Sequence, residues 1–122
     1  MKNGFKDLIV YQKAFSLAMD IYKTSMQFPN EELYSLTSQI RRSSRSVCSN
    51  IGEGYRKRLY EAHFISKMSD ADMENSETLV WLDFAIECKY LSRENYNDYL
   101  SRCLEVGRMI SAVIKNPSKF RY

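Results

Sequence analysis

The chain has 122 residues, of which 44% are hydrophobic and 27% charged, with 4 Gly, 2 Pro and a net charge of +3. This length predicts a single domain over residues 1–122, and the apolar share excludes wholesale disorder. A β-sandwich or β-barrel needs a turn signal every ~8–12 residues, and so few breakers cannot supply them. The small net charge does not by itself mark a nucleic-acid binder.

Several sequence features that would mark a location or an activity are absent. Segment 1–7 has no apolar core of a secretory signal, and no run of ~18 apolar residues exists, so we expect a cytoplasmic protein with no membrane partner. The three cysteines, Cys48, Cys88 and Cys103, form no CxxC pair, which favours core-filling thiols over a zinc site. The single histidine, His63, has no nucleophile or acid–base partner, so we predict no catalytic residue, no cofactor and no enzyme.

Four helical segments are predicted in chain order, and the first two flank the first proline. The first covers about residues 5–27, and Phe28-Pro29 ends it, with Asn30 as a candidate N-cap for the next. The second covers about 31–51, and Gly52-Glu53-Gly54 is expected to end it. The apolar stripe of the first is Leu8, Tyr11, Phe15, Ala18, Ile21 or Tyr22, and Met26; that of the second is Tyr34 or Leu36, Ile40, Ser43 or Ser44, Val47 and Ile51.

The third and fourth segments are also predicted from apolar periodicity. The third, from Leu59 or Tyr60 to about Leu91, carries a heptad seam of Phe64, Met68, Ala71, Asn75, Thr78, Leu82 and Ala85. The fourth begins after the candidate N-cap Ser92 and runs to about Lys115, with a stripe of Tyr96, Leu100, Cys103, Gly107, Ile110 and Ile114. A short basic, aromatic tail follows at 117–122. Long helices with short links predict an all-α, up-down antiparallel four-helix bundle.

The net charge conceals a strong partition along the chain. Between residues 41 and 58 there are six basic residues and one acid, a net of +5, whereas 68–88 holds six acids and no base. The basic residues are Arg41, Arg42, Arg45, Arg56, Lys57 and Arg58, and the acids are Asp70, Asp72, Glu74, Glu77, Asp83 and Glu87. Such a basic cluster attracts nucleic-acid backbone, and the flanking Tyr55 and Tyr60 could stack on unpaired bases.

Two interpretations of the basic cluster remain open at this point. In one, the arginines contact RNA or DNA; in the other, they pair with the acids of the third helix, in the same subunit or a neighbour. The acids Asp70, Glu74 and Glu77 share one helix face, which raises the separate question of a metal site. Di-iron bundles, however, use a Glu-x-x-His motif on two helices, and this chain has one histidine. We therefore predict no metal site.

Several stretches carry a family resemblance. Segment 28–42 (FPNEELYSLTSQIRR), followed by 46–54 (SVCSNIGEG), resembles the signature of the bacterial four-helix bundle family, also called 23S ribosomal RNA intervening-sequence proteins. The opening 5–14 and the stretch 74–82 (ENSETLVWL) are similar to other parts of the same pattern, so the resemblance covers nearly the whole chain.

The resemblance implies an up-down bundle that assembles as a homopentamer and has no enzymatic activity. It also implies a relationship to accessory proteins of diversity-generating retroelements, in which a ring of basic charge is thought to bind nucleic acid and a reverse transcriptase. Within the motif, Gln39, Asn50, Glu53 and Gly54 are interpreted as structural: Asn50 and Glu53 as caps of helix ends, Gln39 as a hydrogen-bonding residue across the bundle. The function class is therefore either a nucleic-acid-binding homo-oligomer, or an interaction module whose basic and acidic helices pair between subunits.

Overall fold

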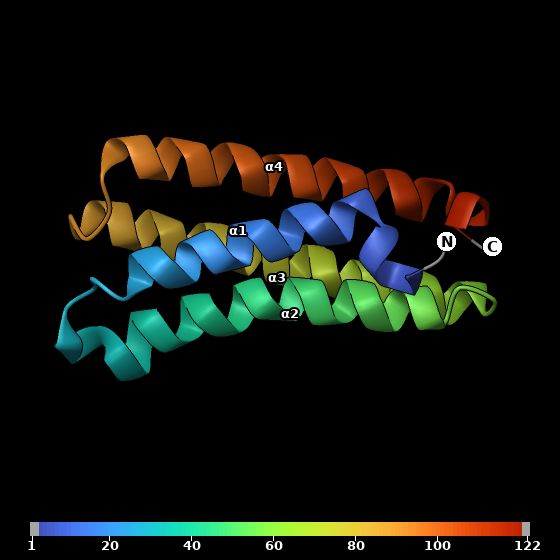
Figure 1. Cartoon of the computed structure of the whole chain (residues 1–122), viewed down its shortest axis with the longest axis horizontal. Coiled ribbons are helices and arrows are strands. Elements are labelled where there is room, and N and C mark those ends of the chain that lie inside the picture. Colours follow the sequence, from blue (N-terminus) through green and yellow to red (C-terminus); the bar gives the residue numbers. More distant parts are fainter. Residues whose placement is uncertain (1–2, 121–122) are drawn as a thin grey trace.

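Four long helices form the body of the molecule in the computed structural model, which describes residues 3–120 (Figure 1). They are α1 (Ile9–Ser25), α2 (Ser38–Arg56), α3 (Glu61–Glu87) and α4 (Arg93–Lys115). Short helical turns flank them at Gly4–Asp7, Asn30–Glu32, Leu33–Thr37 and Pro117–Phe120, and no strand occurs in this range. The predicted all-α four-helix architecture is confirmed.

The helices follow one another around the bundle in chain order. α1 packs against α2 and α4, and α3 packs against the same two helices from the other side. The links are short, so consecutive helices run antiparallel, and α1 and α3 run in the same direction at opposite corners (Figure 1).

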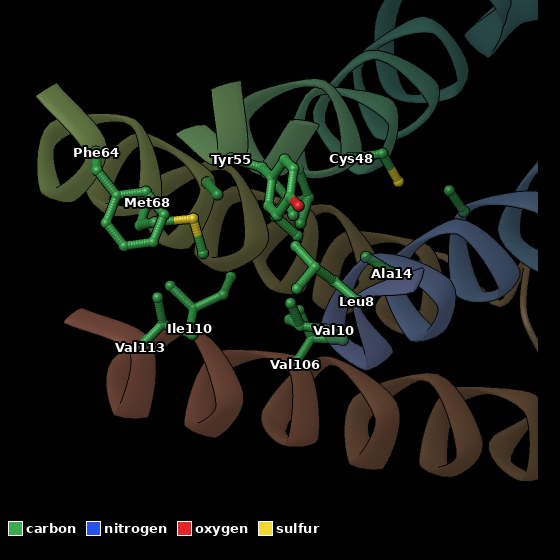
Figure 2. Packing of buried hydrophobic residues seen from close by; sticks show 14 residues of the cluster. Leu8, Val10, Ala14, Cys48, Tyr55, Phe64, Met68, Val106, Ile110 and Val113 are labelled. Carbon is green, nitrogen blue, oxygen red and sulfur yellow. The ribbon is translucent and has the colours of Figure 1, made fainter. Parts of the chain in front are cut away.

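The core consists of two apolar clusters with a polar layer between them. The cluster near the chain ends takes side chains from all four helices, and Figure 2 shows Leu8, Tyr55, Met68 and Ile110 pointing toward one another. The second cluster, which includes Ile21, Ile40, Leu82 and Cys103, fills the other half of the bundle.

Buried hydroxyls and an amide make up the polar layer. Ser43 Oγ lies 2.8 Å from Thr78 Oγ1, and Thr78 Oγ1 also donates to the carbonyl of Glu74 at 2.9 Å. Asn75 Nδ2 donates to the carbonyl of Cys103 on α4 at 2.8 Å, and Asn75 is only 5% exposed. Because buried polar groups cost free energy unless they are paired, these contacts tie α2, α3 and α4 together at one level.

The seam predicted on α3 is confirmed, because all seven of its residues are buried. The stripe predicted for the first helix is right in part: Leu8, Ala18 and Ile21 are buried, but Phe15 is 50% and Met26 58% exposed, and the core face also includes Val10, Ala14 and Leu17. Of the stripe predicted for the fourth helix only Cys103 and Ile110 are buried, together with Tyr99, Val106 and Val113. α1 is apolar on two faces, and periodicity alone could not tell which one meets the core.

The predicted ends of the second helix are also corrected. A 3₁₀ turn and a π turn cover Asn30–Thr37, and the side chain of Glu32, not Asn30, caps there by accepting a hydrogen bond from Leu36 N at 3.4 Å. At the other end α2 runs through both glycines to Arg56. A Cβ on Gly54 would lie 3.2 Å from both Lys67 Cβ and Met68 Sδ, so this glycine permits the close approach of α2 to α3. By contrast Ser92 caps α4 as predicted, its Oγ accepting from Asn95 N at 3.1 Å.

The two glycines of α2 are expected to respond differently to alanine. Gly52→Ala places a Cβ at an ordinary 3.6 Å from the ring of Phe5, so the better helix propensity of alanine should stabilise the protein by about 0.5–1 kcal/mol. Gly54→Ala forces α3 to shift, so its gain should be cancelled or reversed. Urea unfolding followed by circular dichroism at one protein concentration checks this; equal stabilisation by both variants would contradict the close approach at Gly54.

Candidate nucleic-acid interface

The six basic residues of 41–58 fall into three structural groups, and Arg42 forms the first alone. Its Nη1 lies 2.9 Å from Glu74 Oε2, and its Nη2 contacts Glu77 Oε2. Burial raises the pKa of Glu74, but hydrogen bonds donated by Ser46 and Arg42, together with the positive charge of Arg42, outweigh it and hold that pKa below its ordinary value. The intramolecular pairing interpretation is therefore correct for Arg42, whose charge is already neutralised within the chain.

Arg41 and Arg45 form the second group, on the side of α2 that faces α1. Their guanidinium carbons lie 4.8 Å and 5.2 Å from the centroid of the same Tyr22 ring. Arg41 Nε also donates to Ser25 Oγ at 2.8 Å. Neither makes an ion pair with a carboxylate of residues 3–120, so two positive charges share one aromatic ring and no carboxylate compensates them.

The third group, Arg56, Lys57 and Arg58, lies at the C-terminal end of α2. Arg58 is fixed there, because its guanidinium carbon lies 4.0 Å above the Tyr55 ring and its Nη1 donates to the Tyr55 carbonyl at 3.0 Å. Arg56 and Lys57 are exposed. In the described part of the chain none of the three contacts an acid, so this end of the bundle presents a concentrated positive charge.

An apolar groove between α1 and α2 adjoins the basic residues. Its volume is about 670 Å³, and its walls include Tyr11, Phe15 and Met19 from α1, with Arg45 and Arg56 from α2. Phe15 is 50% and Met19 38% exposed, although both are large and apolar. This groove was not predicted from the sequence, although the second apolar face of α1 is a signal for it.

The four motif residues lie within or beside α2, and their predicted individual roles are corrected. Asn50 and Glu53 cap no helix end: Asn50 Nδ2 donates to the Ser46 carbonyl at 2.9 Å, and Glu53 pairs with Lys67 of α3 at 3.0 Å. Gln39 does not bridge the bundle, since its Oε1 accepts from Arg42 Nε on the same helix at 3.1 Å. Gly54 lies at the α2–α3 approach.

Little in the described residues suggests redox, metal or membrane chemistry. Burial raises the pKa of the Cys48 thiol to about 11 and that of Cys103 to about 12, which suits unreactive core thiols. Cys88 is exposed, so the prediction of a core-filling thiol is wrong for that residue. Over residues 3–120 no group of three or more histidine, cysteine or acidic side chains is arranged to hold a metal ion. No helix in this range combines the length and apolar character needed to cross a bilayer.

Comparisons with known proteins agree with the sequence resemblance. A crystal structure from Bacteroides thetaiotaomicron, described as a protein with unknown function from the S23 ribosomal protein family, is 28% identical with a TM-score of 0.79. The alignment covers 88% of this chain and 96% of that one. No curated protein matches the chain. The family described as 23S rRNA-intervening sequence protein matches residues 6–112, and a match over most of the sequence shows that the chain belongs to that family.

Proposed function

We propose that this protein is a non-enzymatic homo-oligomer, a pentamer, that binds RNA or DNA backbone through the basic side of α2. The observation that carries the proposal is that five of the six predicted basic residues contact no carboxylate in the described chain: Arg41, Arg45, Arg56, Lys57 and Arg58. Arg42 is left out of the interface because Glu74 and Glu77 already neutralise it.

The arrangement of these residues favours backbone contact over base readout. Charges at Arg41, Arg45 and Arg56 lie on one side of a 19-residue helix, and a rigid helix spaces them at fixed intervals. The guanidinium group of arginine binds two phosphate oxygens at once, whereas recognition of a duplex sequence requires a protein element that enters a groove of the nucleic acid. Repetition of the patch in an oligomer would raise avidity without any new contact.

A salt titration tests the proposal directly. Binding of a structured RNA and of a DNA duplex should weaken by about 0.7–0.9 log units per log unit of salt for each phosphate contact. Lys57→Ala/Arg58→Ala should make the slope of log affinity against log salt shallower by the contribution of about two phosphate contacts, because both residues lie at the basic end of α2. Arg93→Ala/Arg108→Ala, which removes the same charge from α4, is the matched control.

Two results would contradict the nucleic-acid interface. Absence of binding to either nucleic acid at ~50 mM salt excludes it, since electrostatic association is strong at low ionic strength. Equal slopes for the α2 and α4 double variants would show that net charge, and not the α2 patch, accounts for the affinity.

A second candidate function is an interaction module in which basic and acidic helices pair between subunits. It is favoured by the acids of α3 that make no intramolecular ion pair within the described residues, among them Asp70 and Glu87. In that case Arg41→Glu/Arg45→Glu should dissociate the oligomer in sizing experiments. An oligomer that survives this change while losing RNA binding excludes the second candidate.

A further inference from the structure

The outer face of α3 carries an apolar stripe with no partner within the bundle. Met73 is 62%, Val80 48% and Phe84 55% exposed, and their spacing places them on the side of α3 opposite its buried seam. Asp70 and Glu77 lie on the same side, because they precede Met73 by three residues and follow it by four. The stripe is therefore apolar and acidic.

The groove between α1 and α2 is the complementary surface. It presents Phe15 and Met19 as exposed apolar groups, and Arg45 and Arg56 as positive charges on the α2 side, while the acid of its lining, Glu53, is paired with Lys67. The groove lies on the α1–α2 side of the bundle, whereas the stripe lies on the outer face of α3, the helix at the corner opposite α1 (Figure 1). One copy can therefore use both surfaces at once, each with a different neighbour.

The two surfaces also match in their level along the bundle. Ala14 and Leu17 of α1, Ser44 and Val47 of α2, and Asn75 and Thr78 of α3 surround one small internal space. Phe15 and Arg45 therefore lie at the level of residues 75–78. Two copies placed side by side in parallel would bring Phe15 beside Met73 and Val80, and Arg45 beside Glu77, whose carboxylate also contacts Arg42 of its own copy.

We infer that the α1–α2 groove of one copy receives the Met73–Val80–Phe84 stripe of a second copy of this chain. The inference rests on the proposed homo-oligomer and names its interface. Contact between two different surfaces is heterologous, so repetition closes a ring when the rotation between copies permits it. In such a ring Arg45 and Arg56 would face the neighbouring copy, so nucleic-acid contact would be left to Arg41, Lys57 and Arg58. Lys57 and Arg58 are not part of the groove lining, and every copy would present them at the same rim.

Single substitutions at exposed positions test each surface separately. Phe15→Glu blocks the groove by placing a carboxylate against the acidic stripe, and Val80→Lys blocks the stripe by placing a cation against the basic groove. Each should weaken self-association about 100-fold or more, because a like charge would be buried at the contact. Leu104→Glu is the matched control, since Leu104 is 46% exposed on α4 outside both surfaces. Circular dichroism verifies that all three variants remain folded, and analytical ultracentrifugation measures their mass.

Mixing the two blocked variants tests whether the stripe of a second copy occupies the α1–α2 groove. Each should be monomeric alone, and the equimolar mixture should form a heterodimer and nothing larger, because only one intact groove and one intact stripe remain. Three results overturn the inference: a monomeric wild type, a mixture that stays monomeric, or full assembly of Val80→Lys, which would indicate groove-to-groove contact. RNA binding by a monomeric wild type would separate failure of this interface from failure of the nucleic-acid function.

Discussion

Asn75→Asp is expected to destabilise the protein by about 3–5 kcal/mol at pH 7, because it leaves an unpaired charge in the core. The amide nitrogen of Asn75 donates to the Cys103 carbonyl at 2.8 Å, and the residue is 5% exposed. Aspartate has the same shape, but its ionised carboxylate can only accept, so two oxygens would face each other without a proton. Urea unfolding at pH 7 measures the loss.

The same variant should recover stability in acid relative to the wild type. Burial disfavours the carboxylate, so the pKa of Asp at position 75 would be higher in the folded than in the unfolded chain, where it is about 3.9. Stability is then lost as pH rises from the unfolded pKa through the folded pKa, and the deficit shrinks as pH falls toward 4. A protonated carboxyl can donate to the Cys103 carbonyl and restore the lost hydrogen bond.

Ser76→Asp is the matched control for this prediction. Ser76 is the next residue of α3 and is exposed, so the new charge stays in water and should change stability by no more than about 0.5 kcal/mol at either pH. Equal unfolding midpoints for the two variants at pH 7 would show that Asn75 is not held in a dry polar layer.

The α3 seam was predictable because that helix buries a single strict heptad, including its polar members Asn75 and Thr78. The core face of α1 was predictable only in part, because Phe15 and Met19 continue the apolar pattern on a surface that the described chain leaves open. Apolar periodicity indicates that a helix face is apolar, but it does not indicate which element packs on that face. The misplaced members of the α1 stripe and the missed groove therefore have one cause.

The sequence predicts that basic residues cluster between positions 41 and 58, but it does not predict that they separate into groups with different partners. Arg41 and Arg42 are sequence neighbours, yet a step of about 100° around the helix turns one toward Tyr22 of α1 and the other toward Glu74 of α3. The ends of α2 were missed for a similar reason. Taken alone, Gly54 indicates the end of a helix, whereas its place beside Lys67 and Met68 depends on the path of another helix.

Met68→Ala and Leu82→Ala should each lower the free energy of unfolding by about 2–5 kcal/mol, because each side chain is at most 2% exposed and truncation leaves a cavity. The residues belong to different apolar clusters, on either side of Asn75 and Thr78. Fourteen residues of helix separate them, a distance of about 21 Å, so their effects should add within about 0.5 kcal/mol.

The double variant tests whether the two apolar clusters unfold together or independently across the polar layer that separates them. If Asn75 and Thr78 couple the two clusters, the double variant still unfolds in one transition, with the summed loss leaving little of the ~5–15 kcal/mol typical of a domain. If the clusters unfold independently, each single variant instead shows two transitions in urea, one shifted and one at the wild-type midpoint. Fluorescence of Trp81, which packs against the Leu82 cluster, reports that half alone, while circular dichroism reports both. Coincident transitions by the two probes are expected, because the hydrogen bonds of the polar layer join α2, α3 and α4 at the boundary between the clusters.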